Sequence, residues 1–392
     1  MPNKDYTTDL LEIKDLIIDK IEKIDFETHI YFTIKQKPHT CPNCGNVTEQ
    51  VHDYRTSIIK DIPAFGNKVF LHYKKRRYHC SCCNKHFYET FTQVPKHHRT
   101  TTRLAFYSIH LLKNKQSVSS VAKMLGISVS SVFRSLKKVR YPKPKEMPVV
   151  LSIDEFRGNA GGEKFQAILT DAKHHKLVDI LPKRTQSTLS EYFRSIKNRN
   201  TVKYFVMDMN KVYKDLAKTY FPNATIVIDK FHVVRYASWA LENVRKRIQK
   251  SMPPHKRIYF KRSRRLLLKR KKDLNEENIQ ALEVMFQQSQ DLATAYYLKE
   301  QFYDLMKSKS RVEAAKKLQD FMILAYASRI KEFEACLTML KNWAKYILNA
   351  FDCPYTNGYT EGTNNAIKVI KRTAFGYRNF DNFRNRIFLA LT

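Results

Sequence analysis

The sequence predicts an α/β domain that is interrupted by a large helical block and preceded by two small domains. Three observations predict this organisation. Apolar runs alternate with helical patterns after residue 149, two Cys-x-x-Cys pairs lie between residues 41 and 83, and residues 231–348 carry helical patterns without a convincing strand. At 392 residues the chain is long enough to bury the cores of several domains.

The charge balance indicates a polyanionic partner. Lys and Arg total 71 against 37 Asp and Glu, which gives a formal net charge of +34. Solubility alone requires a smaller excess, whereas cations that neutralise phosphates release counterions and so drive association. No stretch resembles a signal peptide or a membrane span, so we expect a cytoplasmic protein that binds nucleic acid and no membrane.

The N-terminal region, residues 1–98, is expected to contain a zinc ribbon. Apolar positions at Leu10, Ile13, Ile17 and Ile21, together with Lys14, predict a short helix, and residues 26–34 predict a strand. Further strands are predicted over residues 57–62 and 68–78. On the second of these, Lys74-Lys75-Arg76-Arg77 would place basic side chains on both faces, either against DNA backbone or as solvated charge.

The two cysteine pairs predict a structural zinc site. Four thiolates at this spacing complete the tetrahedral coordination of Zn²⁺, and cytosolic cysteines stay reduced. Cys82 leaves the second pair ambiguous, but the two-residue gap favours Cys80 and Cys83. The alternative is a set of unrelated buried thiols. The predicted ligands are Cys41, Cys44, Cys80 and Cys83.

Residues 99–141 predict a helix-turn-helix. Val118, Val121, Ala122 and Leu125 share one helical face, Gly126 permits a sharp turn, and Ser128 is a good N-cap for a second helix. That helix is expected to bury Val129, Val132, Leu136 and Val139. A plain helical hairpin is the alternative, and the outward set favours DNA contact: Ser130, Ser131, Arg134, Lys137 and Lys138. Three prolines within residues 142–148 mark a linker.

The order of elements after the linker matches a ribonuclease H-like fold. Three strands are predicted first, over residues 149–156, 164–171 and 177–181. A helix near 189–196, a strand ending at Asp208, a helix near 212–220 and a strand over 225–228 follow. We assign residues 149–235 and 352–392 to this domain and residues 236–351 to a helical insertion.

Three carboxylates, each from a different element, form the candidate catalytic site. Asp154 lies in the first strand of this domain, Asp208 closes the fourth, and Glu361 opens a helix near the C-terminus. Carboxylates that converge at a sheet edge repel one another unless a cation neutralises them. Oxygen ligands of this kind suit Mg²⁺ or Mn²⁺, which can activate both the attacking and the leaving oxygen of a phosphodiester.

Two further basic features lie in the second half of the chain. Residues 245–272 hold fourteen Lys or Arg and no acid, which favours phosphate contact over base reading. Lys368 and Arg372 share a helical face with Glu361 and Asn365, either to place DNA across the metal site or as part of an ordinary amphipathic helix. Aromatic residues within 374–380 stack on a partner or fill the core.

Taken together, these landmarks resemble the ISL3 family of bacterial insertion-sequence transposases. The resemblance covers nearly the whole chain and is carried by the cysteine knuckles, Ile153-Asp154-Glu155-Phe156, Met207-Asp208-Met209, Asp229-Lys230-Phe231-His232-Val233, residues 357–365 and Gly376-Tyr377-Arg378-Asn379-Phe380. It implies a DDE catalytic domain with the triad Asp154, Asp208 and Glu361, and with Asp229 and His232 as possible accessory residues.

The resemblance also implies a bacterial, nucleoid-associated protein whose partner is double-stranded DNA, binding to terminal inverted repeats, and cut-and-paste movement of the element. Because two transposon ends must be joined, we expect a homodimer or a larger assembly on DNA. Two alternatives remain open from the sequence. One is a zinc-ribbon and helix-turn-helix regulator with an inactive catalytic domain, and the other is a site-specific nuclease without strand transfer.

Overall fold

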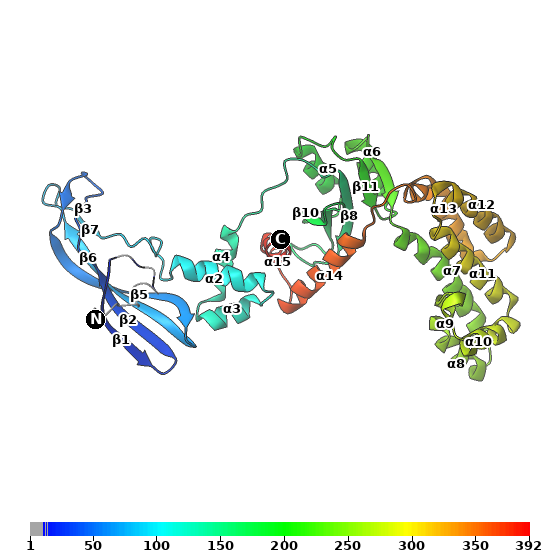
Figure 1. Ribbon diagram of the computed structural model, residues 1–392, viewed down its shortest axis with the longest axis horizontal. Coiled ribbons are helices and arrows are strands. Elements are labelled where there is room, and N and C mark those ends of the chain that lie inside the picture. Colours follow the sequence, from blue (N-terminus) through cyan, green and yellow to red (C-terminus); the bar gives the residue numbers. More distant parts are fainter. Residues whose placement is uncertain (1–10, 12, 14) are drawn as a thin grey trace, which may run out of the picture. The chain divides into compact units, whose positions relative to one another are not determined.

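The computed structural model describes residues 11, 13 and 15–392, which fall into two compact units. One unit combines the residues up to Tyr141 with Ile370–Thr392, and the other comprises Pro142–Val369. The sequence grouped residues 370–392 with the catalytic domain, whereas in the structure they pack with the N-terminal helices. Each unit has its own arrangement of secondary structure (Figure 1).

The N-terminal unit begins with a twisted sheet whose strands follow the order β1-β2-β6-β5, with β7 also paired to β6. The strands are β1 (Leu16–Ile24), β2 (Glu27–Ile34), β5 (Val51–Ala64), β6 (Asn67–His79) and β7 (His86–Tyr88), and the short pair β3 (His39–Thr40) and β4 (Val47–Thr48) forms a separate ladder. The predicted strands over 26–34, 57–62 and 68–78 are confirmed, and the last two are longer than expected.

The predicted N-terminal helix is wrong from Asp15 onward, where the chain forms a turn and then β1, whereas Leu11 is helical. Ile17 and Ile21 lie in β1, which pairs antiparallel with β2, while Leu10 and Lys14 lie outside the described residues. A spacing of four residues is compatible with one face of a helix and also with one face of a strand, where side chains alternate every two residues. Pairing with β2 decides between the two.

Among the described residues, helices follow the sheet of the N-terminal unit, and the first three of those named here form the predicted helix-turn-helix region. They are α2 (Thr102–Lys113), α3 (Val118–Leu125), α4 (Val129–Lys138) and the C-terminal α15 (Phe380–Leu391). Leu389 of α15 joins the core made by Leu104, Val121 and Leu136. This contact explains why the end of the chain belongs to the N-terminal unit.

The second unit is built on a mixed five-stranded sheet of order β10-β9-β8-β11-β12. The strands are β8 (Val150–Phe156), β9 (Gln166–Asp171), β10 (Lys176–Leu181), β11 (Tyr204–Met207) and β12 (Thr225–Ile228). The first three pair antiparallel, and β8, β11 and β12 run parallel. These are the strand order and directions expected for a ribonuclease H-like domain, so the predicted fold class is confirmed.

The two faces of β8 contact different layers because its side chains alternate. Leu151 and Ile153 point into a core shared with α5 (Gln186–Ser195) and α6 (Lys211–Tyr220). Val150 belongs to a separate small cluster with Val206, Val227 and the segment around Cys353. Ser152 and Asp154 share the face of Val150, which directs them away from α5 and α6.

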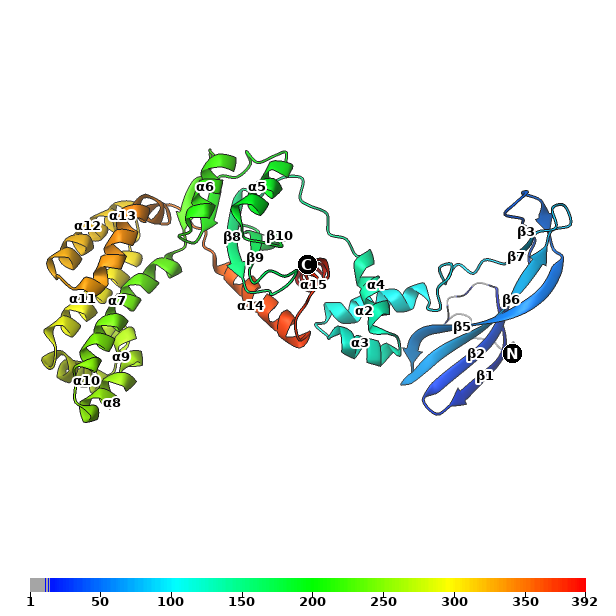
Figure 2. The ribbon, with the colours of Figure 1, turned by 180° about the vertical axis from the view of Figure 1, so that it is seen from behind.

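A block of helices separates β12 from the last helix of this unit. It comprises α7 (Lys230–Lys250), α8 (Pro254–Arg262), α9 (Arg264–Leu268), η1 (Lys271–Asp273), α10 (Glu276–Gln287), α11 (Gln290–Met306), α12 (Arg311–Ala327), η2 (Lys331–Phe333) and α13 (Glu334–Asn349). Figure 2 shows α7, α11, α12 and α13 beside one another. The chain returns to its starting strand, since the Asn349 side-chain amide donates to the Ile226 carbonyl of β12 at 2.7 Å.

The last helix of the unit, α14 (Gly358–Thr373), lies beside β8 (Figure 1). The predicted helix opening at Glu361 is confirmed. Among the helices that the structure describes, none combines the length and the apolar composition that a bilayer crossing requires.

Candidate active site

Three acids come together because three parallel strands end at one sheet edge. Asp154 is near the end of β8, Asp208 directly follows β11, and Asp229 directly follows β12. Since these strands run in the same direction, their carboxyl ends meet at one edge, where α/β sheets commonly bind ligands.

Asp208, Asp229 and His232 form a compact group. One carboxylate oxygen from each acid and one ring nitrogen of His232 lie within 4.8 Å of one another. His232 stands in the first turn of α7, and its Nε2 is 3.1 Å from Asp208 Oδ1. Asp154 and Glu361 are not members of this group. The structure therefore places Asp229 and His232, expected only as accessory residues, closest to Asp208.

The remaining acids act on this group through their charge. Burial, and next the charge of Asp208, raise the pKa of Asp154 to about 7. Burial also raises the pKa of Asp208 to about 7, and the negative charges of Asp229, Glu155 and Glu361 add to that shift. The pKa of Asp229 is likewise raised, first by burial and further by Glu361. The three predicted acids thus belong to one electrostatically coupled cluster.

A buried polar network holds the start of α14 against the sheet. The side chains of Ser152 and Asn357 are hydrogen-bonded, and the Thr360 hydroxyl donates to Ser152 Oγ at 3.1 Å. Thr360 also shares a 2.7 Å hydrogen bond with Thr170 of β9. Because every partner here is buried, a shift of α14 by one residue would leave several polar groups without partners. The network therefore fixes where Glu361 enters the cluster.

Asn364 is a site residue to which the sequence analysis gave no role. Its Nδ2 donates to Asp154 Oδ2 at 2.8 Å, and its buried Oδ1 accepts no hydrogen bond among the described residues. The sequence directed attention to Asn365, which lies on the exposed face. A signal was present in the adjacent Asn pair, since Asn is a poor helix former and two in one helix interior require another reason.

The donor set fits divalent cations. Asp154, Asp208, Asp229 and Glu361 offer carboxylate oxygens, and burial, together with the charges of neighbouring acids, raises the pKa of the first three. A hard cation accepts such oxygens and removes the repulsion. His232 adds a nitrogen donor, which Mn²⁺ tolerates better than Mg²⁺ does.

The four predicted zinc ligands also come together. Their sulfurs lie within 4.8 Å of one another, with Cys41 and Cys83 Sγ 3.5 Å apart and Cys44 and Cys80 Sγ 3.5 Å apart. Zn–S bonds of about 2.3 Å give sulfur separations of about 3.8 Å in a tetrahedron, so the group fits Zn²⁺. Cys82 is exposed and outside the group, which resolves the ambiguity in favour of Cys80 and Cys83.

The surroundings of Cys80 and Cys83, the second cysteine pair, favour the thiolate form. The Asn43 side chain, followed by the backbone N–H of Lys85, lowers the pKa of Cys83 to about 6. The backbone N–H of Cys83 is the main cause that lowers the pKa of Cys80. Donors directed at sulfur favour the charged form, which is the form that ligates metal.

The helix-turn-helix has the expected turn and cap. Gly126 ends α3 with φ of +61°, and the Ser128 side chain accepts from the Ser131 backbone N–H at 3.2 Å to start α4. Val132 and Leu136 are buried, but Val129 is 41% exposed, so its predicted burial is wrong. It is the first residue of α4, where the chain has not yet turned onto the core. Ser130, Arg134, Lys137 and Lys138 are exposed, and Ser131 is partly buried.

One member of the basic run on β6 does not face solvent. Arg76 is buried, and its Nη1 lies 3.2 Å from Glu89 Oε2. Its contact with DNA is therefore excluded in this conformation, and its charge serves to satisfy Glu89. Lys74 on the same strand remains exposed.

Comparison with known proteins identifies the class of the chain. Residues 151–387 match a family described as a transposase of the ISL3 DDE type, residues 37–83 match the zinc finger of transposases IS204, IS1001, IS1096 and IS1165, and residues 89–138 match the helix-turn-helix domain of transposase family ISL3. The protein is therefore a DDE transposase, an enzyme whose partner is DNA. It belongs to the ISL3 family and is IS1001-like.

Individual relatives agree with this assignment. The transposase for insertion sequence element IS1001 from Bordetella parapertussis is 28% identical over 366 residues, which cover 90% of this chain and 89% of that protein. The transposase for IS1557 from Mycobacterium tuberculosis is 26% identical over 241 residues, or 55% of this chain and 54% of that protein. A Lactococcus lactis protein named ATP-dependent protease is 33% identical over 100 residues, but these cover only 25% of this chain and 30% of that protein.

Proposed function

We propose that this transposase binds the terminal inverted repeats of its insertion sequence and catalyses metal-dependent DNA strand cleavage and strand transfer. The observation that carries the proposal is the electrostatic coupling of Asp154, Asp208 and Glu361, which come from two strands and a distant helix. Their charges are costly to hold together unless cations share them.

We assign Asp154, Asp208 and Glu361 as the catalytic acids that hold Mg²⁺ or Mn²⁺. Such ions, when bound, lower the pKa of a coordinated water and neutralise charge on the phosphodiester. Asn364 keeps the Asp154 carboxylate oriented through its 2.8 Å hydrogen bond. Asp229 and His232 act as accessory residues beside Asp208, whose Oδ1 lies 3.1 Å from His232 Nε2.

We also propose domain boundaries, in which residues 370–392 count with the catalytic domain although they pack with the N-terminal helices. They are a zinc-ribbon region over 1–98, a helix-turn-helix domain over 99–141, a linker over 142–148, a catalytic domain over 149–235 and 352–392, and an insertion over 236–351. Side chains of α4 and α14, exposed except for the partly buried Ser131, would contact DNA: Ser130, Ser131, Arg134, Lys137, Lys138, Lys368 and Arg372. Since two transposon ends must meet, the active form would be a homodimer or larger.

One assay separates the proposed reaction from the alternatives. Purified protein is mixed with magnesium and end-labelled DNA that carries the terminal repeat. Joined strands support the full proposal, nicks alone indicate a nuclease, and binding without any product indicates a regulator. Asp154→Ala, Asp208→Ala and Glu361→Ala should each abolish products while end binding persists.

The same assay tests which acid is the second member of the triad. Cleavage that survives Asp208→Ala but disappears in Asp229→Ala would show that the assignment of Asp208 is incorrect. This comparison is needed because both acids follow parallel strands and lie in one group with His232.

A further inference from the structure

The basic segment of the helical block surrounds a cavity that none of the catalytic residues uses. Residues 245–272 contain fourteen Lys or Arg and no acid. At the start of this segment, α7 and α8 border a cavity of about 360 Å³. The residues that line it all have polar or charged side chains: Asn243, Lys246, Arg247, Gln249, Lys250 and Arg257.

Some of these cations already have carboxylate partners. Arg247 Nε lies 2.6 Å from Glu332 Oε1, and its Nη2 lies 2.9 Å from Asp291 Oδ2. Two acids therefore compensate Arg247, which acts as part of the cavity wall.

The other three cations of the cavity are largely uncompensated. Lys246 Nζ is 3.9 Å from Glu242 Oε1, but that carboxylate is already engaged by the buried Arg245 at 2.7 Å. Within the part of the chain that the structure describes, Lys250 and Arg257 form no ion pair and are exposed. Three positive charges on one concave surface repel one another and favour an anion between them.

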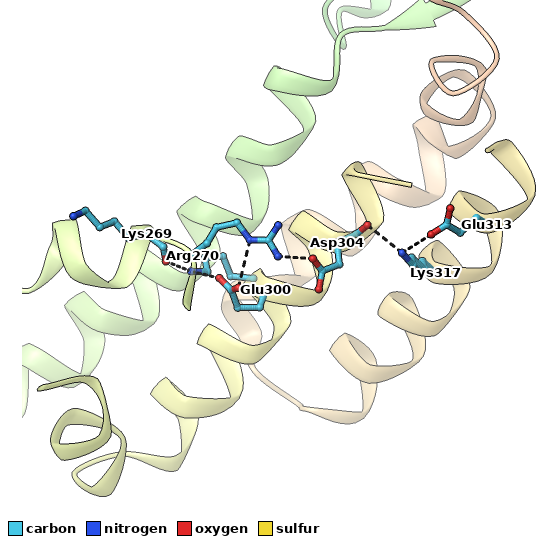
Figure 3. Close-up of polar contacts among 7 residues, drawn as sticks. Lys269, Arg270, Glu300, Asp304, Glu313 and Lys317 are labelled. Atoms are coloured by element: carbon cyan, nitrogen blue, oxygen red, sulfur yellow. Dashed lines mark hydrogen bonds and ion pairs between the residues drawn. The ribbon is translucent and has the colours of Figure 1, made fainter. Parts of the chain in front are cut away.

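Buried polar contacts hold the C-terminal end of the basic segment against α11. The ammonium of Lys299 on α11 is fully buried and donates to the carbonyls of Leu267 and Lys269 at 3.1 and 2.6 Å, which ends α9. The next residue, Arg270, pairs with Glu300 and Asp304, and the backbone carbonyl of Asp304 accepts from Lys317 (Figure 3). The segment is thus anchored at its far end although its charges repel.

We propose that Lys246, Lys250 and Arg257 bind the phosphate backbone of duplex DNA as a site separate from the helix-turn-helix and the acids. The proposal rests on the proposed function, which supplies DNA as the substrate. Lys and Arg at this surface neutralise phosphates without reading bases, so the site would add affinity and not sequence preference. The polar lining is compatible with phosphate oxygens, because Asn243 and Gln249 can donate additional hydrogen bonds.

The test compares the full chain with the triple variant Lys246→Gln, Lys250→Gln, Arg257→Gln. Binding to two labelled duplexes, one with the terminal repeat and one unrelated, is measured by fluorescence anisotropy at several salt concentrations. Each lost phosphate contact reduces the slope of log K against log salt by about 0.9, so the slope should fall by roughly 2 to 3 for both duplexes. The preference for the repeat should stay unchanged.

A matched control removes equal charge elsewhere in the helical block. Lys316, Lys341 and Lys345 are exposed on α12 and α13, and their replacement by Gln should change the slope by less than about 1. Equal losses in both triple variants would overturn the proposal, because total charge alone would then explain the binding. An unchanged slope in the first variant would also overturn it, as would loss of binding to anionic phospholipid vesicles without loss of binding to DNA.

Two controls keep this test independent of the catalytic proposal. Circular dichroism must show that the first triple variant is folded, which its exposed positions favour. Asp154→Asn should retain the full salt slope while it loses cleavage. If Asp154→Asn still cleaves, the catalytic assignment fails, but the phosphate site is tested all the same by the slopes.

Discussion

Replacing Asp208 by Asn should stabilise the magnesium-free enzyme while it abolishes cleavage. The Asp208 side chain is only 25% exposed, and burial with neighbouring negative charges raises its pKa from 3.8 to about 7. Asn keeps the shape of the side chain and carries no charge. The substitution therefore removes the cost of burying a charge beside other acids, a cost that a bound cation would also reduce.

The size of this effect follows from proton linkage. A carboxyl with a raised pKa in the folded state contributes stability below pH about 4, and that contribution is lost as the pH rises through about 7. Taking about 1.4 kcal/mol per tenfold change, the penalty for Asp208 is about 2 kcal/mol at pH 5 and about 4 kcal/mol at pH 8. The advantage of Asp208→Asn over the parent should therefore grow by about 2 to 3 kcal/mol between these pH values.

The two tryptophans of the chain make this advantage measurable. Trp239 and Trp343 both lie in the same compact unit as Asp208, so their fluorescence during urea unfolding reports on that unit. The buffer should lack magnesium and contain no chelator, so that zinc stays bound to the cysteines. Added magnesium should stabilise the parent more than the variant and so reduce the difference between their free energies of unfolding.

A matched carboxyl provides the control. Asp320 is exposed on α12 in the same unit, and Asp320→Asn should leave the dependence of stability on pH unchanged. If the parent and Asp208→Asn show parallel stability curves from pH 5 to pH 8, the acids do not repel one another as described, and the argument for shared cations loses its physical basis.

Three further predictions concern other parts of the molecule. Lys299→Met should lower the free energy of unfolding by about 3 kcal/mol in urea titrations, because Glu300 and two backbone carbonyls lose the buried Lys299 ammonium as a donor. A loss below about 1 kcal/mol would show that these contacts do not anchor the basic segment. Cys80→Ser should lower the zinc content measured by mass spectrometry, whereas Cys82→Ser should retain one zinc per chain. Gly126→Ala should lower the free energy of unfolding by about 1 kcal/mol, since φ is +61° and the new Cβ would lie 3.2 Å from a Lys68 side-chain carbon. An unchanged midpoint of thermal unfolding would refute this prediction.

Much of the fold could be predicted because its local patterns agree with its tertiary structure. Strands such as β8 and β12 are apolar runs that are buried on both faces, and the structure confirms their positions. The prediction of an N-terminal helix failed because apolar residues four positions apart lie on one face of a strand such as β1 as well as on one face of a helix. Hairpin pairing with the adjacent β2 settled that choice, and the spacing of apolar residues alone does not reveal such pairing.

The acids of the candidate site could be predicted from the sequence, but the residues that hydrogen-bond to them and position them could not. Asp154 and Asp208 follow from their position on apolar strands, and Glu361 followed from the resemblance and the helix it opens. The hydrogen bonds from Asn364 to Asp154 and from Thr360 to Ser152 join residues more than two hundred positions apart. Asn and Thr also occur in helices far from the site, such as α13, so only the folded structure shows which of them are buried against the acids.

The helical block leaves β12 through α7 and is tied back to the same strand by the 2.7 Å hydrogen bond from Asn349 to Ile226. An inserted block whose first and last residues lie next to each other can become longer or shorter without displacing the strands that it connects. The reason is that the entropy cost of closing a loop grows slowly with loop length. Relatives should therefore tolerate gain or loss of whole helices between α8 and α12, whereas an insertion of one residue between Asn349 and Asn357 would misalign Glu361.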